Sequence, residues 1–160
     1  MPTISCRFKK SFAVALFGLA AIGNADAQTA TAPAKFDAEA AQRMGADQRG
    51  MRSYVLVLLK TGPNKMAVGK ERDEMFAGHF ANINRLASEG KLLLAGPFDG
   101  VDGWRGLFVF AVKDIEEAKQ LTATDPVIVK GEMVAEYHKW YGSAGVMDIP
   151  RLHETLYEKK

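Results

Sequence analysis

The stretch LLLAGPFDGVDGWRGLFVF, residues 92–110, decides the fold. Its two apolar runs are separated by residues 99–103, a segment of glycine and aspartate that is typical of a hairpin turn. The first run, over residues 91–98, closes on Gly96-Pro97, and in the second, over residues 105–112, two sets of apolar side chains alternate. We therefore expect two antiparallel strands joined by a short turn.

The chain before this hairpin predicts a strand and a helix. Residues 54–59 form a continuous apolar run, ended by a Gly-Pro turn, which indicates a strand buried on both faces. Residues 70–89 change to helical spacing, and Gly90 ends them. The apolar stripe expected on this helix consists of Phe76, Phe80, Ile83 and Ala87.

The chain after the hairpin predicts a second helix and a last strand. Asp114 is a suitable N-cap for a helix over residues 115–123, and Asp125-Pro126 ends it, because a residue before proline disfavours helical geometry. Residues 133–141 indicate the last strand. The order β-α-β-β-α-β predicts an α+β, ferredoxin-like fold in which a four-stranded antiparallel sheet carries both helices on one face.

The second face of such a sheet is left without a helix. The first and third strands are nonetheless apolar on both sides, and monomeric proteins rarely expose an apolar patch of that size. We therefore expect a homodimer in which the two sheets face each other.

The first 27 residues predict a signal peptide. A basic run (Arg7, Lys9 and Lys10) precedes an uncharged, mostly apolar stretch over residues 11–23. The sequence Ala25-Asp26-Ala27 then places small residues before a cut at Gln28. The alternative is an uncleaved membrane anchor, although the stretch is shorter than the ~20 residues of a membrane span. We expect a periplasmic or secreted protein that is not attached to the membrane once this segment is removed.

Composition limits the function classes. The chain has 160 residues, of which 48% are hydrophobic and 25% charged, the values of one soluble domain. Its net charge is +2, and without the leader the chain has 18 basic and 18 acidic residues, which gives no support to a nucleic-acid binder. The single cysteine, Cys6, lies in the leader, so the exported chain would use no thiol chemistry.

The expected domain order has four parts. Residues 1–27 are the signal peptide and 28–52 a linker, in which 36–44 would suit a short helix. Residues 53–142 form the folded domain, and 143–160 a C-terminal extension with an exposed helix at about 151–159.

Together these patterns resemble the YCII-related family of the dimeric α+β barrel superfamily. The resemblance covers about residues 53–141 and rests on the spacing of four motifs: His79-Phe80-Ala81, Glu89-Gly90-Lys91-Leu92, Ala95-Gly96-Pro97 and Thr124-Asp125-Pro126. It implies a ferredoxin-like dimer with a histidine-aspartate active site, and activity is demonstrated for few members.

His79 is the strongest catalytic candidate. On a helical wheel it falls within the arc of Met75, Phe76 and Ile83, so its ring should point to the sheet, where an imidazole can transfer a proton near neutral pH. The resemblance matches Asp125 to its acidic partner, and Asp99 is the second choice. The alternative is a core histidine that is hydrogen-bonded to the backbone.

The remaining candidates are weaker. His138 lies in the last strand and His153 in the tail, and three scattered histidines give no metal-ligand spacing. Four aromatic residues could line a pocket or simply belong to the core: Tyr54, Phe98, Trp104 and Trp140.

We therefore expect an enzyme without cofactor or metal that uses its His/Asp pair for proton transfer or elimination on a small organic substrate. The alternative is a periplasmic module that binds a small molecule or mediates dimerisation without catalysis.

Overall fold

A computed structural model describes residues 35–158 of the chain. The expected signal peptide and the first part of the expected linker lie outside these residues. Among the residues described, no helix is long and apolar enough to cross a membrane.

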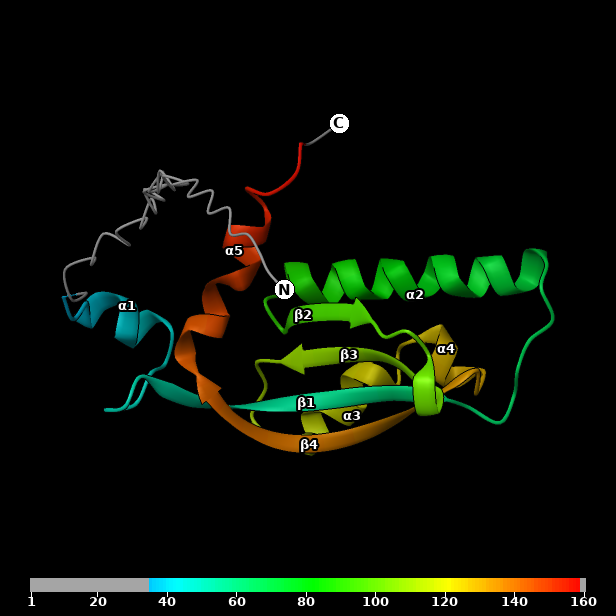
Figure 1. The fold of residues 1–160 in the computed structure, drawn as a ribbon, viewed down its shortest axis with the longest axis horizontal. Coiled ribbons are helices and arrows are strands. Elements are labelled where there is room, and N and C mark those ends of the chain that lie inside the picture. Colours follow the sequence, from blue (N-terminus) through cyan, green and yellow to red (C-terminus); the bar gives the residue numbers. More distant parts are fainter. Residues whose placement is uncertain (1–34, 159–160) are drawn as a thin grey trace, which may run out of the picture. The chain divides into compact units, whose positions relative to one another are not determined.

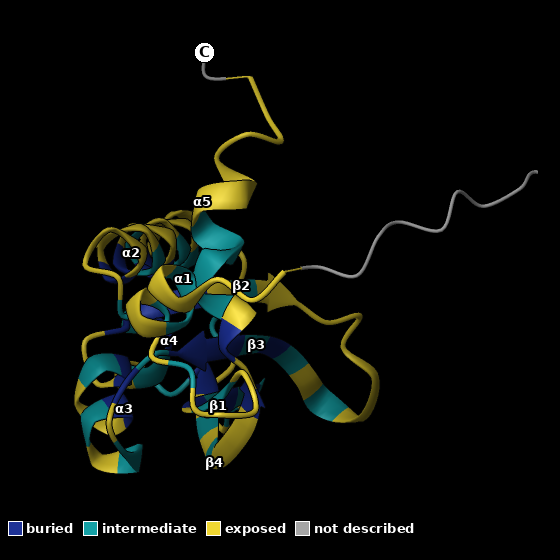
Figure 2. Cartoon of the chain, turned by 90° about the vertical axis from the view of Figure 1, so that its left-hand side faces the viewer, coloured by how far each residue is buried: buried dark blue, intermediate teal, exposed yellow. Residues whose placement is uncertain are grey.

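The structure confirms the α+β fold with β-α-β-β-α-β order (Figure 1). The four strands are β1 (Met51–Thr61), β2 (Leu92–Pro97), β3 (Trp104–Phe110) and β4 (Met133–Ser143). They form one sheet in the order β2-β3-β1-β4, and every neighbouring pair is antiparallel. The main helices are α2 (Lys70–Ser88), α3 (Ile115–Thr122) and α4 (Pro126–Val129). Figure 2 shows these three helices on the same side of the sheet.

The core lies between the sheet and these helices. Alternate residues of β1 face it, and Val55, Val57 and Leu59 are each at most 2% exposed. Phe108 and Phe110 of β3 lie across the register from Val57 and Val55. Burial of one such side chain stabilises the fold by about 1.5–3 kcal/mol, so this two-layer core holds α2 against the sheet.

The expected apolar stripe of α2 is confirmed in part: Phe76 and Ile83 pack against the core, but Phe80 and Ala87 are exposed. The buried residues of α2 are Met75, His79, Asn82 and Leu86. Phe80, which the stripe included, is 60% exposed. The polar side chains of His79 and Asn82 are buried because Asp125 and Thr124, respectively, hydrogen-bond them, which hydropathy alone does not indicate.

The hairpin between β2 and β3 turns through η1 (Val101–Gly103), a 3₁₀ turn. Gly100 and Gly103 have φ of 88° and 76°, a left-handed geometry that costs glycine little. The Asp99 side chain accepts a hydrogen bond from the Val101 N–H at 3.1 Å, which also stabilises the turn.

A β-bulge lies where β3 begins. Leu59 of β1 pairs with Gly106, but its neighbour Lys60 pairs with Trp104, so Arg105 is the extra residue. A bulge shifts the alternation of side chains by one position and is common beside functional sites.

An aspartate caps the start of each of the helices α3 and α4. Asp114 accepts from the Glu117 N–H at the start of α3, as expected. The chain leaves α3 before Pro126, and Asp125 then caps a further short helix, α4, which the sequence analysis did not anticipate. Four residues are too few to show helical periodicity.

Both flanking segments contain regular structure. Within the segment expected as a linker lies α1 (Ala38–Arg43). After β4 come η2 (Ala144–Asp148) and α5 (Ile149–His153). The tail helix thus begins and ends earlier than expected, since it stops at His153. Pro150 lies in its first turn, where proline is favourable.

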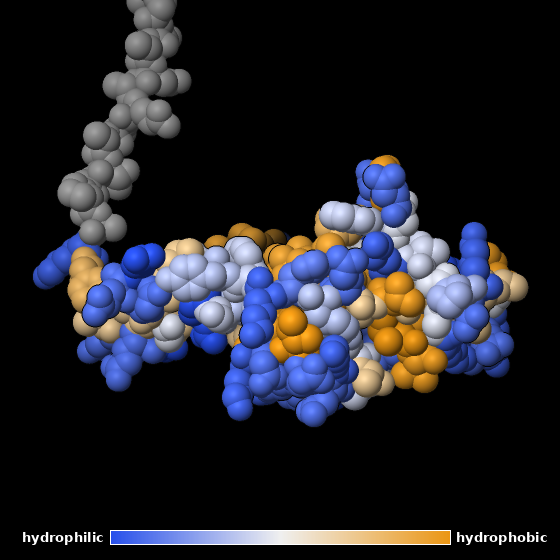
Figure 3. Space-filling view, turned by 90° about the horizontal axis from the view of Figure 1, so that it is seen from below, coloured by the Kyte–Doolittle hydropathy of each residue, from blue (hydrophilic) through white to orange (hydrophobic). Residues whose placement is uncertain are grey.

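The sheet face opposite the core is partly covered. Val146 and Met147 of η2 pack over Tyr54 and Val109 at one end of this face. On the same face, Leu94, Val134 and Trp140 are between 37% and 44% exposed. The surface seen from below, where β4 lies, is by contrast mostly hydrophilic with a few separate hydrophobic groups (Figure 3).

Candidate active site

His79 lies in the middle of α2 with its ring turned inward. The residue is only 7% exposed, and the rings of Phe76, Phe80 and Phe108 surround the imidazole at centroid distances of 5.4–6.1 Å. The Phe108 ring lies nearly parallel to it, at 25°. Aromatic walls on several sides restrict rotation of the imidazole.

Asp125 is the acidic partner of His79. Its carboxylate oxygens lie 2.8 Å (Oδ2) and 3.0 Å (Oδ1) from His79 Nδ1, and the residue is fully buried. Oδ1 also accepts the N–H of Val127 at 3.1 Å, as an N-cap of α4. An ionised carboxylate can only accept hydrogen bonds, so Nδ1–H of His79 donates to it, and the ring in its neutral form then has its lone pair on Nε2.

Two contacts between α2 and the α3–α4 turn hold this pair together. A Cβ added at Gly78 would lie 3.0 Å from Pro126 Cγ, so the glycine permits a close approach beside each member of the pair. One turn later, Asn82 Oδ1 accepts hydrogen bonds from Thr124 Oγ1 at 2.9 Å and Arg85 Nη2 at 2.8 Å. The pair therefore lies on a fixed scaffold, which catalysis and ligand binding both require.

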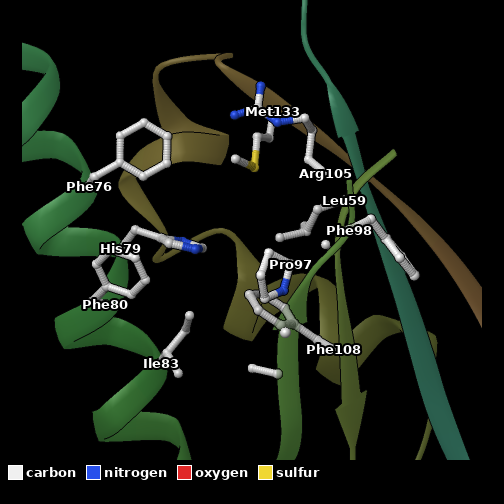
Figure 4. A pocket seen from close by; sticks show the side chains of 13 residues that line it. Leu59, Phe76, His79, Phe80, Ile83, Pro97, Phe98, Arg105, Phe108 and Met133 are labelled. Carbon is white, nitrogen blue, oxygen red and sulfur yellow. The ribbon is translucent and has the colours of Figure 1, made fainter. Parts of the chain in front are cut away.

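The imidazole opens into a cavity of about 390 Å³ between α2 and the sheet (Figure 4). His79 lines this cavity, whereas Asp125 does not. Since Nδ1 is directed to Asp125, Nε2 is the ring nitrogen available to a bound molecule. The lining residues are otherwise mostly apolar: Leu59, Phe76, Phe80, Ile83, Ala95, Gly96, Pro97, Phe98, Arg105, Gly106, Phe108 and Met133.

A buried ion pair stands beside this cavity. Glu132 is 1% exposed and accepts hydrogen bonds from the Met66 N–H at 2.6 Å and Arg72 Nη2 at 2.9 Å. These two donors hold the pKa of Glu132 below its ordinary value, against the opposing effect of burial. The Arg72 guanidinium also lies 4.6 Å from the Phe76 ring centre, so the pair supports one wall of the cavity.

The other sequence candidates lie elsewhere. Asp99 is exposed and caps the hairpin turn, and among the described residues only Asp125 bonds to His79. His138 is on the surface of β4, where it contacts Glu136, and His153 contacts Tyr157 in the tail. Of the four aromatic candidates, only Phe98 lines the cavity, and the described part of the chain holds no cluster of three possible metal ligands.

Sequence reasoning missed Arg105, Gly78 and Asn82. The bulge that directs Arg105 to the cavity has no sequence signal of its own. Gly78, a glycine inside a helix beside the catalytic candidate, was a visible signal, because such a glycine costs about 1 kcal/mol relative to alanine and needs a packing reason.

The folded domain that contains this site matches a known protein family. The model of the YCII-related domain matches residues 53–140, more than half of the chain. The chain belongs to the YCII-related family. The matched segment contains both members of the His79–Asp125 pair and all four strands in whole or in large part.

Two further similarities accompany the family match. The chain is 28% identical over 90 residues to the "Uncharacterized protein YjpA" of Bacillus subtilis (strain 168), covering 56% of this chain and 95% of that protein. Among solved structures, it is similar to 5-chloro-2-hydroxyhydroquinone dehydrochlorinase (TftG) from Burkholderia phenoliruptrix AC1100, in complex with 2,5-dihydroxybenzoquinone. That match has 19% identity and a TM-score of 0.42, and covers 54% of this YCII-related chain and 92% of the other.

Proposed function

We propose that this YCII-related protein is an exported enzyme that transfers a proton on a small organic substrate, or eliminates a group from it, without a cofactor. The observation that carries the proposal is the buried Asp125 carboxylate on Nδ1 of His79, which leaves Nε2 to the apolar cavity. A histidine held by a carboxylate is a suitable general base near neutral pH.

The reaction begins with Nε2 of His79. It takes a proton from a carbon or hydroxyl group of the substrate, and Asp125 stabilises the resulting imidazolium. In simple proton transfer, the imidazolium returns the proton to another atom of the substrate. In elimination, the electron pair of the broken C–H bond forms a double bond, the leaving group departs with its own electron pair, and the proton passes to it or to solvent.

The cavity suits a small, largely apolar substrate. Its volume of about 390 Å³ falls in the usual range of ~300–1,000 Å³ for ligand pockets. Phe76, Phe80 and Phe108 line it, and aromatic rings pack favourably against a flat molecule. A binding module without catalysis is the alternative function, and it would use the same cavity.

Deuterium exchange tests the proposal on a range of compounds, so the natural substrate need not be identified first. A panel of small carbon acids is incubated with the protein in D₂O, and loss of each C–H signal is followed by NMR. The panel includes halogenated compounds, for which halide release is measured. We expect exchange or release above the buffer rate in the wild type and loss of it in His79→Asn.

The outcomes separate the two functions. Equal activity of the wild type and His79→Asn would contradict the role of His79. If panel compounds bind in the cavity without exchange or elimination, the binding module is the better account.

We also propose that the chain forms a homodimer through the sheet face opposite the core. Leu56 and Leu58 of β1 are half-buried on this face, beside the exposed Leu94 and Val134. Covering this face with a second copy would remove apolar surface from water on both chains. Light scattering at micromolar concentration tests the proposal, and a monomer would contradict it.

Export is proposed on the sequence alone. The basic run, the apolar stretch and Ala25-Asp26-Ala27 have the order of a secretory signal. Expression of the full chain in a bacterial host, followed by mass spectrometry of the periplasmic fraction, should give a protein that begins at Gln28. Recovery of the uncleaved chain in the membrane fraction would support the anchor instead.

A further inference from the structure

We propose that Arg105 makes the cavity selective for small organic anions and binds their negatively charged oxygen group, a carboxylate or a phenolate. This inference rests on the proposed function in that it takes the cavity beside His79 as the substrate site. It goes further because it names the chemical class of the substrate and the residue that selects it.

The β-bulge directs Arg105 to the cavity. In regular alternation Arg105 would share a face with Leu107, whose register partner Leu58 faces away from the helices. The extra residue in β3 breaks this alternation, and Arg105 lines the same cavity as His79. Figure 4 shows the Arg105 side chain extending from β3 along one end of the cavity, while His79 projects from α2.

The backbone of Arg105 is fixed in the hairpin. Its carbonyl accepts the N–H of Phe98 at 3.0 Å, and the next residue, Gly106, pairs with both Leu59 and Pro97. The guanidinium is thus presented from a rigid strand rather than from a loop, which lowers the entropy lost when a ligand binds.

The guanidinium has no ion-pair partner of its own within residues 35–158. Glu132, whose pKa its charge helps to lower, is already bonded by Met66 and Arg72, and these contribute more. Two other arginines of the domain are engaged in ion pairs: Arg72 pairs with Glu132 and Arg85 with Glu89. Arg105 retains donors for a ligand, and a guanidinium can bind a carboxylate through two parallel hydrogen bonds.

The charges around the cavity favour an anion. Of the 13 described residues that line it, Arg105 is the one permanent cation, and none is an aspartate or glutamate. The rest of the lining is apolar except for the imidazole of His79. A guanidinium in a largely apolar wall attracts an anion more strongly than it would in water.

The two polar groups fit one substrate. Arg105 would hold the charged oxygen at one end of the cavity, and Nε2 of His79 would act on a proton elsewhere in the molecule. A fixed anchor for the substrate raises the rate by orienting the reacting atoms. The substrate class is therefore a small aromatic or otherwise apolar acid that carries one anionic oxygen group.

Binding of matched probes tests this inference independently of turnover. Benzoate is compared with benzamide, and 4-nitrophenolate with 4-nitroanisole, in NMR titrations that follow the signals of His79 and of the Arg105 Nε–H. The proteins are the wild type, Arg105→Gln and Arg105→Lys. Arg49→Gln, which removes a positive charge outside the cavity, controls for net charge, and His79→Asn controls for the imidazole.

We expect the wild type to bind at least one anion about 10- to 100-fold more tightly than its neutral partner, the range of a charge-assisted hydrogen bond. Arg105→Gln should abolish this preference, Arg105→Lys should keep part of it, and Arg49→Gln and His79→Asn should retain it. The probe pair that shows the preference identifies the oxygen group. Because Arg105 is half-exposed, we expect its variants to fold. Their NMR signals from residues away from the cavity should match those of the wild type.

Three results would overturn the inference: no binding of any probe near His79, equal binding of anions and their neutral partners, or an anion preference that survives Arg105→Gln. The outcomes also separate the two proposals. A preference that depends on Arg105 in a protein without turnover supports the anion site and opposes the enzyme. Turnover that depends on His79 in a protein without an anion preference supports the enzyme and opposes the anion site.

Discussion

Nδ1 of His79 lies within 3.0 Å of both carboxylate oxygens of Asp125, although 46 residues separate the two in sequence. Both side chains are buried, and one comes from the middle of a helix while the other caps the start of a second helix. Asp125 thus has two structural partners, His79 and the Val127 N–H, and the imidazole has a fixed orientation.

Asp125→Asn should lower turnover of the carbon acid found by deuterium exchange by about 10²–10⁴-fold, because a neutral amide does not stabilise the imidazolium. The amide oxygen can still cap α4, so we expect a stability loss of only about 1 kcal/mol. The rate and the thermal midpoint should be measured on the same preparation. Asp99→Asn is the matched control and should leave the rate unchanged. Equal rates for wild type and Asp125→Asn would contradict the role of Asp125.

Gly78→Ala should disturb the pair from outside it. The added Cβ would meet Pro126 Cγ at 3.0 Å, so α4 must shift by a few tenths of an ångström and take Asp125 with it. We expect slower turnover, while the gain in helix propensity, about 1 kcal/mol, offsets part of the loss of stability. Ala77→Gly, an exposed change on the same helix, is the control for propensity. An unchanged rate and unchanged His79 signals in Gly78→Ala would show that the close approach is not required.

Glu132→Gln should change how stability depends on pH. The folded state lowers the pKa of Glu132, chiefly through the Met66 N–H and then Arg72, so its charged form stabilises the fold. This contribution is fully present above the ordinary glutamate pKa of about 4.3 and is lost as pH falls through the lowered value. Urea unfolding should therefore show wild type more stable than Glu132→Gln at neutral pH, with the difference closing in acid. If the stability difference between wild type and Glu132→Gln did not change with pH, the charged form of Glu132 would not be the source of the stabilisation.

Leu94→Glu should weaken the proposed homodimer. Leu94 is 39% exposed on the sheet face opposite the core, where two introduced carboxylates would have to be desolvated in a dimer. Light scattering should give a lower mass for this variant than for the wild type at the same concentration. Val129→Glu places the same charge at an exposed position of α4 and should leave the mass unchanged. The same mass for all three proteins would contradict the proposed interface.

Much of the fold could be predicted from alternation, spacing and caps. Residues 54–59 and the hairpin over 92–110 give apolar runs of strand length, and Asp114 and the Asp125-Pro126 step mark helix ends by local chemistry. These signals are local, so they can be recognised before the tertiary structure is determined.

The parts that sequence did not predict depend on contacts between distant segments. The helical wheel predicted that His79 turns toward the sheet, but it did not indicate that Asn82 is buried. Asn82 Oδ1 accepts a hydrogen bond from Thr124 on the α3–α4 turn, a contact that hydropathy cannot show. The family resemblance ranked Asp125 above Asp99, and the contact of Asp125 with His79 was established by the fold. Arg105 reaches the cavity through a bulge in the pairing of β1 with β3. Its position therefore depends on the register between these two strands, which the sequence does not reveal.

The central feature of the proposed active site is that Asp125 holds His79 as the tautomer with the proton on Nδ1 and the lone pair of Nε2 facing the cavity. Its most direct test is a ¹⁵N–¹H correlation spectrum of the His79 ring, recorded where the ring is neutral. We expect a protonated Nδ1 with its proton shifted downfield by the carboxylate, and an unprotonated Nε2 whose signal moves when benzoate is added. A proton on Nε2 instead, or a ring whose signals no cavity probe moves, would contradict it.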